Sequence, residues 1–480
     1  MTNSLAFFFA SCLFAILFFW FYVRPTLSLS STALGLLLVF HGPAYWYYTR
    51  FWVLRKGFFF NFYNEFNTTG AEKSIDGSKA SQINEKLRAI SSNYYDQILA
   101  AAENLDTIQS LDIALGLTLL VFCAGIWATD KALGYTRHAH DLALRDWKTR
   151  SFLPLKPNQS PLLVVLGGVA VLFMVYFLIR DEQLTKVHTY FFTSASEFDK
   201  IAMRRSMGGS QSYLFNLMLS TLLPFVAFVF WTWWREGGEK SIGWLAALVI
   251  LLVITAKAAT LSKAPPAVFV LQLLVLEVAR NSLSFDKRQL AALGLASVLL
   301  FSAMTFVANS DLSGISESLT FLFYRLLMIP NESLLEYFAV FPSQFPHTMG
   351  LDIRWLAKLM GTEPMQSNFW RVAELLRGAP GSTTTAMFMA DAWAAFSWAG
   401  VVGASFLFGC LIRWIDIQLL VKRGRSCVTL AGLGLGHYGI FIAMSTALQT
   451  SLLTGGLLLI VPTVALLERQ WPRQAPGGSA

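Results

Sequence analysis

The chain has 480 residues, of which 55% are hydrophobic and only 14% are charged, and its formal net charge is +8. Because an ordinary soluble domain carries roughly 25% charged residues, this composition excludes a water-soluble globule. The apolar residues fall in blocks of about 17 to 25, the length that crosses a bilayer as a helix. The sequence therefore predicts an all-α, polytopic integral membrane protein with a single transmembrane domain over residues 1–480.

Hydropathy predicts about eleven transmembrane helices. They are expected near residues 4–23, 32–49, 109–128, 161–180, 212–234, 242–260, 265–279, 289–308, 384–411, 428–448 and 450–467. The first block also resembles a signal peptide, but no basic segment precedes it and Arg24 follows it, so we predict a true span. Two polar stretches interrupt the pattern. We expect a helical insertion over 50–108 and a large loop carrying the active site over 309–383.

Basic residues predict the orientation of the helices, because short cytoplasmic loops are enriched in Lys and Arg. The loops 129–160, 280–288 and 412–427 are basic and consistent with a shared cytoplasmic face. This arrangement places the C-terminus inside and the N-terminus and both long polar stretches outside. The remaining Lys and Arg then lie on the outer face, where they form a solvated or lipid-contacting surface or bind an anionic substrate.

The stretch 309–383 interleaves aromatic, basic and acidic side chains. Aromatic rings stack on sugars and guanidinium groups bind phosphoryl oxygens, although an amphipathic loop on a membrane surface has a similar composition. The candidate groups for binding a sugar phosphate are Tyr324, Arg325, Arg354, Trp355, Arg371 and Arg377. Glu336 and His347 are candidates for proton transfer.

Five further polar residues lie at or within predicted spans. Arg204 and Arg205 precede a glycine pair at the start of a span, which forms either a phosphate-binding helix N-terminus or a plain turn. Lys257 and Lys263 lie near the outer end of another span, as functional cations or as snorkelling side chains. Asp391 lies about two turns inside an apolar block, where a carboxylate is costly unless it is paired or faces water. We predict a functional role for it, with an Arg of the preceding loop as its partner.

Motifs for other chemistries are absent from the sequence. The four cysteines have neither CxxC nor metal-ligand spacing, and no P-loop, dinucleotide-binding turn or metalloprotease motif occurs. We therefore expect no metal, no cofactor and no nucleic-acid partner. His41 and His437, each within an apolar span, are expected to be buried structural hydrogen-bonding residues.

The run GSTTTAMFMADAWAAFSWAGVVGASFLFGCLIRWID (residues 381–416) resembles the C-terminal signature of O-antigen and exopolysaccharide repeat-unit polymerases. In that family, polar residues lead into an acidic residue, then an aromatic and glycine step and a glycine-bearing helix. Asp391 stands where the family usually has Glu. Three other runs are similar to the family: HGPAYWYYTRFW, MRRSMGGSQSYLFNLMLSTLLP and FYRLLMIPNESLLEYFAVFPSQFPHTMG.

The resemblance implies a membrane glycosyltransferase of the all-helical (GT-C) type in the bacterial inner membrane, with its active site facing the periplasm. It would polymerise undecaprenyl-pyrophosphate-linked oligosaccharide units during surface polysaccharide and lipopolysaccharide biosynthesis, without a metal or cofactor. Membrane lipids and a chain-length-regulating co-polymerase are further implied partners. As a hypothesis, Arg204, Arg205, Arg325 and Arg354 clamp the pyrophosphate. Asp391 or Glu336, with His347 as the rival, takes the proton of the acceptor hydroxyl.

Two alternatives remain. An O-antigen ligase, which transfers glycan from the lipid carrier to lipid A-core, also uses Arg and His in a large periplasmic loop, and His347 and Arg354 are compatible with it. A flippase or other transporter of lipid-linked oligosaccharides would show internal repeats and charges within the bundle. The sequence shows no repeat, and its charge is expected mainly in the outer loops, so the polymerase is favoured.

Overall fold

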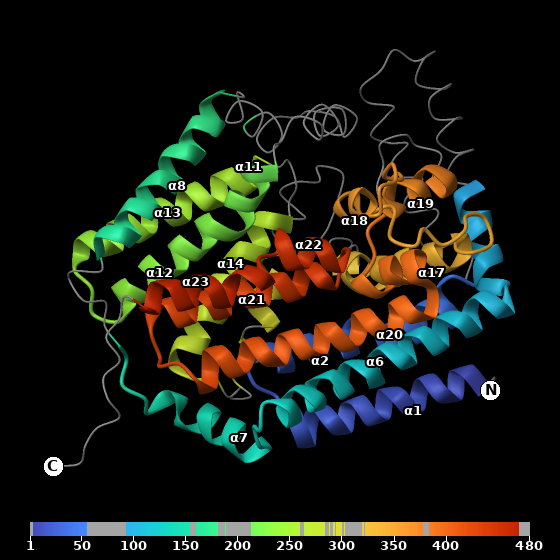
Figure 1. The fold of residues 1–480 in the computed structure, drawn as a ribbon, viewed down its shortest axis with the longest axis horizontal. Coiled ribbons are helices and arrows are strands. Elements are labelled where there is room, and N and C mark those ends of the chain that lie inside the picture. The colour runs from blue at the N-terminus through green and yellow to red at the C-terminus, as the bar shows by residue number, and fades with distance from the viewer. Residues whose placement is uncertain are drawn as a thin grey trace.

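The structure, a computed structural model, describes residues 3–54, 93–153, 160–180, 213–259, 264–283, 322–377 and 384–469, with single residues and short runs such as 294–299 in the gaps. Within these ranges all named elements are helices, and extended pairing is confined to isolated bridges such as Leu153–Ser426. The helices lie side by side in slanted rows along the long axis of the molecule (Figure 1). The described residues therefore confirm the all-α class of the predicted membrane protein.

The N-terminal half begins with a long helix that continues into a π-helical turn. Its elements are α1 (Asn3–Phe18), η1 (Phe19–Val23), α2 (Leu29–His41), α3 (Pro43–Tyr47), η2 (Tyr48–Trp52), α6 (Leu105–Ala132), α7 (Arg137–Arg145), η3 (Asp146–Lys148) and α8 (Ser160–Arg180). Residues 93–103 are also helical, so the described part of the expected insertion 50–108 is helical, and α6 begins inside that range.

The part of the chain from residue 213 onward contains α20, the longest of the described helices. Its elements are α11 (Tyr213–Leu217), η5 (Met218–Leu222), α12 (Leu223–Arg235), α13 (Lys240–Ala258), α14 (Ala264–Asn281), η6 (Tyr324–Met328), α17 (Ile329–Val340), α18 (Arg354–Leu359), α19 (Asn368–Arg377), α20 (Phe388–Asp416), η7 (Ile417–Val421), α21 (Cys427–Ala443), α22 (Leu448–Leu453) and α23 (Leu457–Arg469).

Within the described ranges, six helical stretches are long and apolar enough to cross a membrane. They are Asn3–Val23, Leu105–Ala132, Phe215–Arg235, Lys240–Ala258, Phe388–Val421 and Leu448–Glu468. The predicted span 32–49 is interrupted at Gly42, whose φ of −91° and ψ of −110° end α2 before Pro43 starts α3. Most of 289–308 lies outside the described residues. The count of eleven spans therefore stays a prediction.

Helix α20 packs along α6 at a distance that only glycine allows. A Cβ atom at Gly409 would lie 2.4 Å from the Phe122 carbonyl oxygen, and one at Gly125 would lie 2.4 Å from the Phe406 carbonyl oxygen. Close backbone contact of this kind compensates for the lack of a hydrophobic driving force between helices in lipid. The α6–α20 pair is therefore packed backbone against backbone at these two glycines.

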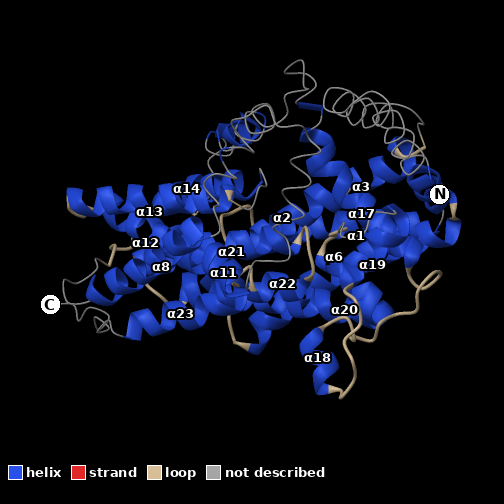
Figure 2. Ribbon diagram, turned by 90° about the horizontal axis from the view of Figure 1, so that it is seen from above, coloured by secondary structure: helices blue, strands red, loops and turns tan. Residues whose placement is uncertain are grey.

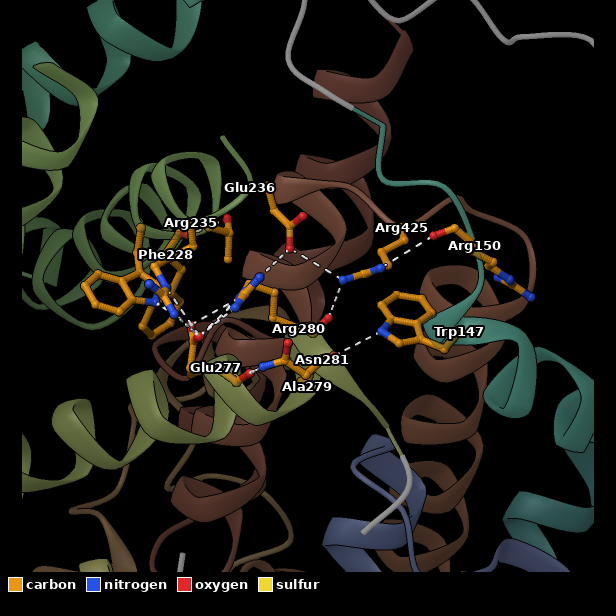
Figure 3. A network of polar contacts seen from close by, with 12 residues as sticks. Trp147, Arg150, Phe228, Arg235, Glu236, Glu277, Ala279, Arg280, Asn281 and Arg425 are labelled. Atoms are coloured by element: carbon orange, nitrogen blue, oxygen red, sulfur yellow. Dashed lines mark hydrogen bonds and ion pairs between the residues drawn. The ribbon is translucent and has the colours of Figure 1, made fainter. Parts of the chain in front are cut away.

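The three basic loops meet at one end of the bundle, as the orientation analysis predicts. Arg280 of α14 pairs with Glu236 and Glu277, each at 2.8 Å (Figure 3). Arg425 donates to the carbonyl oxygens of Arg280 and Arg150, which joins the chain before α21 to the ends of α14 and η3. The Trp147 indole N–H donates to the Ala279 carbonyl oxygen at 3.0 Å. These contacts tie the ends of α12, α14 and the two basic connections together.

Some charged residues also lie inside the bundle, in addition to those in the loops. Arg413 of α20 forms two hydrogen bonds, at 2.7 and 2.8 Å, with Asp130 of α6, and both residues are 1% exposed. Asp112 of α6 pairs with Arg50 at 3.1 Å. Each charge is close to the end of an apolar block, so hydropathy averaged over a whole span does not reveal it.

Candidate active site

Helix α20 is broken one to two turns after Asp391. Phe396 (φ −129°, ψ 15°) and Ser397 (φ 56°, ψ −142°) are not helical. The break interrupts the helical hydrogen-bond ladder, and two carbonyl oxygens just before it accept hydrogen bonds from a loop instead. The Thr348 amide donates to Ala394 at 3.1 Å and the Met349 amide donates to Ala395 at 2.8 Å. The loop 347–352 is therefore bonded to the short N-terminal segment of α20 that carries Asp391.

This loop places a second carboxylate beside Asp391. Asp352, which is 5% exposed, accepts a hydrogen bond of 2.7 Å from the Thr348 hydroxyl. Burial raises the pKa of the Asp352 carboxyl, and the Thr348 hydroxyl and the Arg371 guanidinium lower it. Asp352 is close enough to Asp391 for the two carboxylates to repel each other, and Asn368 of α19 faces Asp391.

Arg371 and His347 lie on the aromatic side of the same site. The Arg371 guanidinium lies 4.2 Å from the Phe345 ring centroid and 5.8 Å from that of Phe341. Burial lowers the pKa of Arg371, and the Asp352 carboxylate raises it. The His347 ring stacks on Phe341 and meets Trp393 of α20 edge-on at 5.2 Å between centroids. A cation, an imidazole and aromatic faces thus surround the two carboxylates.

The site contains buried polar atoms that lack hydrogen bonds. Among the described residues, these atoms near Asp391 are His347 Nδ1, Arg371 Nη1, Thr384 Oγ1 and both amide atoms of Asn368. Asn368 faces Asp391 without reaching hydrogen-bond geometry. Because buried polar groups in proteins are almost always hydrogen-bonded, a cluster of unsatisfied donors and acceptors indicates a site for a polar ligand.

A neighbouring group of tyrosines and glutamates lies along α17. The Tyr94 hydroxyl donates to Glu336 and, at 2.7 Å, to Glu332, and Glu332 also accepts from Tyr324 at 3.1 Å. Tyr337 lies between this group and the Asp391 site. Its pKa is raised well above the usual value by burial and by the carboxylates of Asp391, Glu336 and Asp352. The acidic candidates are therefore gathered around α17.

The structure separates the predicted site residues into three sets. Asp391, His347 and Arg371 lie together, and Glu336 and Tyr324 belong to the adjacent tyrosine–glutamate group. The second set lies away from this site: Arg325 is exposed on η6, Arg354 and Trp355 are exposed on α18, and Arg377 ends α19. Lys257 of α13 is only 1% exposed, and its ammonium group lies 4.8 Å from the centroid of the Tyr438 ring. The third set, Arg204, Arg205 and Lys263, lies outside the described residues.

The expected arginine partner interacts with Asp391 indirectly. Arg371 interacts with Asp352, and Asp352 in turn faces Asp391. His41 and His437 are buried hydrogen-bonding residues, as predicted. His41 Nδ1 lies 3.0 Å from the Asn331 amide oxygen, and His437 Nδ1 lies 2.7 Å from the Leu433 carbonyl oxygen.

Sequence reasoning does not single out Asp352, Asn368 or Thr348. Their importance comes from the docking of a loop and of α19 onto α20, and no spacing in the sequence signals that contact. In the described ranges, no group of three or more His, Cys, Asp or Glu side chains is arranged to hold a metal ion. The chemistry available at the site is proton transfer by carboxylates and imidazole, and anion binding by Arg371.

A scan against protein-family models finds no match for this chain, and neither curated proteins nor solved structures match it.

Proposed function

We propose that the protein is a membrane glycosyltransferase that polymerises oligosaccharide units carried on undecaprenyl pyrophosphate. The observation that supports the proposal most directly is the group of the partly buried residues Asp391, His347 and Arg371, with the buried polar atoms around it that lack hydrogen bonds, at one end of an apolar helix bundle. The resemblance of residues 381–416 to repeat-unit polymerases centres on the same Asp391.

The chemistry of the site fits an amphiphilic substrate with an anionic head. The hydrocarbon tail would remain in the lipid beside the apolar spans. The guanidinium of Arg371 would bind a phosphoryl group. The amide of Asn368 would bond sugar hydroxyls, which are both donors and acceptors.

The proposed reaction breaks the bond between the anomeric carbon of the donor glycan and a pyrophosphate oxygen. An acceptor hydroxyl oxygen attacks that carbon and its proton passes to the Asp391 carboxylate, while the pyrophosphate leaves with the electron pair. The leaving group gains negative charge, which Arg371 stabilises. Arg204, Arg205, Arg325 and Arg354 remain candidates for binding the distal phosphate, and His347 remains the rival base.

The test is complementation of a strain that lacks the protein. The variants Asp391→Asn and Arg371→Gln should each reduce long-chain polysaccharide by about 100-fold or more, because each removes a charge that acts in the transition state. Matched controls are Asp106→Asn, an exposed residue of α6, and Glu374→Gln, an exposed residue of α19. A normal polymer ladder from Asp391→Asn at equal protein level would contradict the proposal.

A ligase is the second candidate, because His347 and Arg371 both pack on the Phe341 ring and so present the pair of residue types that a ligase uses. The glycan profile of the deletion strain distinguishes the two activities. One repeat unit on lipid A-core indicates that a polymerase is lost, and lipid A-core without any repeat unit indicates that a ligase is lost.

A further inference from the structure

We propose that Thr348 is a positioning residue that holds the Asp352 carboxylate against Asp391, so that the two carboxylates act as one proton-accepting pair. The inference rests on the proposed glycosyl transfer and assigns a role within the same site to two residues that the sequence did not single out.

Thr348 contacts both partners at once. Its hydroxyl donates to Asp352 Oδ1 at 2.7 Å, and its backbone amide donates to the Ala394 carbonyl oxygen at 3.1 Å. Ala394 lies one turn after Asp391 on the short segment of α20 before the break. The same residue thus fixes the loop to the helix that carries one carboxylate and orients the other carboxylate directly.

The loop around Thr348 has a shape that the surrounding contacts must maintain. Met349 has a φ of 50° and Gly350 a φ of 81°. A Cβ atom at Gly350 would lie 2.5 Å from a Leu356 methyl carbon and 2.7 Å from the Phe396 ring, so the loop packs tightly against the break in α20. A non-glycine residue with positive φ persists only where neighbouring contacts determine it, which indicates that the position of Thr348 is fixed.

Several groups face Asp352 and decide its protonation. They are Asp391 on α20, Arg371 on α19, Tyr337 on α17 and Thr348 on its own loop. Two carboxylates that repel each other lose their protons in two coupled steps, and each step is a property of the pair and not of one residue. When the O–H bond of the attacking sugar hydroxyl breaks, either carboxylate of the pair can therefore take up the proton.

The sign of the effect of Thr348 follows from its hydrogen bond. The hydroxyl stabilises the ionised form of Asp352 and lowers its pKa. Removing the hydroxyl therefore raises the pKa of Asp352, and the pair becomes available as a base only at higher pH. Activity should fall at acidic pH and recover at alkaline pH.

The experiment compares Thr348→Val, which keeps the side-chain shape without the hydroxyl, with Thr348→Ser, which keeps the hydroxyl. Initial rates of polymer formation are measured against pH in membrane vesicles supplied with undecaprenyl-pyrophosphate-linked repeat units. Thr348→Val should move the acid limb of the profile to higher pH and regain the wild-type rate within about twofold at alkaline pH. Thr348→Ser should keep the wild-type profile.

An unshifted profile for Thr348→Val, or an equal loss for both variants at every pH, would overturn the inference in favour of a purely structural role. Infrared titration of the Asp352 carboxyl band in the purified protein, identified by its loss in Asp352→Asn, separates this inference from the proposed function. A shift of the band midpoint to higher pH in Thr348→Val supports the contact even if no polymer forms. A wild type that makes no polymer at any pH counts against the proposed function alone.

Discussion

Arg413 and Asp130 form a buried ion pair in an apolar region of the protein. Their two hydrogen bonds are almost completely buried, and the Tyr22 hydroxyl donates to the same carboxylate at 2.9 Å. Desolvation makes such a pair a weak source of stability, whereas the loss of one partner leaves a buried charge uncompensated. The pair therefore fixes the register between α6 and α20 more than it strengthens the fold.

The substitution Arg413→Leu should lower the free energy of unfolding by about 3–5 kcal/mol, because Asp130 then has no compensating charge. Thermal unfolding of the purified protein in detergent measures the effect. Arg137→Gln is the control, since the Arg137 side chain is 44% exposed and its pair with Asp141 spans 3.8 Å. That change should cost less than about 1 kcal/mol. Equal losses for the two variants would show that burial of the pair has no role.

Part of the candidate site could be predicted from single residues. Asp391 is conspicuous because a carboxylate is costly inside an apolar block, and His347 and Arg371 follow from the mixed composition of 309–383. Asp352 could not be selected in the same way. An acidic residue in a polar loop is ordinary, and only the contacts of Thr348 with α20 bring it to Asp391.

At the scale of elements, the contact between α6 and α20 depends on two glycines that face each other's backbone. Gly409 meets the carbonyl of Phe122, and Gly125 meets the carbonyl of Phe406. A side chain at either position would force the two helices apart.

Gly409→Ala should therefore destabilise the protein by about 1–3 kcal/mol, the usual cost of overpacking. Gly403→Ala is a matched control on the same helix, since a Cβ atom there meets nothing within 4 Å. The two melting temperatures in detergent give the comparison. If Gly403→Ala were as destabilising as Gly409→Ala, close packing at Gly409 would not be the cause, since Ala favours a helix more than Gly does.

Hydropathy predicts the positions of the described apolar helices well, because their length and apolar content are properties of the sequence itself. It does not predict their interruptions. Gly42 with Pro43 divides the second span, and Phe396 with Ser397 breaks α20. Such breaks depend on tertiary contacts that supply new hydrogen-bond donors, as Thr348 and Met349 do for α20.

For the whole molecule, the candidate active site and the basic network occupy different ends of the bundle. Helices α17 and α19 lie near the N-terminal ends of α1 and α20, whereas α12 and α14 lie toward the other end (Figure 2). The arginine network joins α12, α14 and the chain before α21 at that second end. If basic connections mark the cytoplasmic face, the candidate site faces away from the cytosol.

Cysteine labelling tests this orientation. Glu363→Cys lies in the exposed connection between α18 and α19, and Lys148→Cys is exposed at the end of η3. A membrane-impermeant maleimide should label the first variant in intact cells and the second only after lysis. Native Cys12, Cys123 and Cys427 are buried and should give little background. If only Lys148→Cys were labelled in intact cells, the orientation would be the reverse of the predicted one, and the candidate site would not face the periplasm.

Reconstitution of the purified protein in vesicles with undecaprenyl-pyrophosphate-linked repeat units tests the central claim most directly. The measurement is the simultaneous appearance of longer glycans and of free undecaprenyl pyrophosphate, for the wild type and for Asp391→Asn. The account predicts that the wild type forms both products in step and that Asp391→Asn forms neither. Movement of intact lipid-linked units across the vesicle membrane, with no new glycosidic bond and no free pyrophosphate carrier, would contradict it.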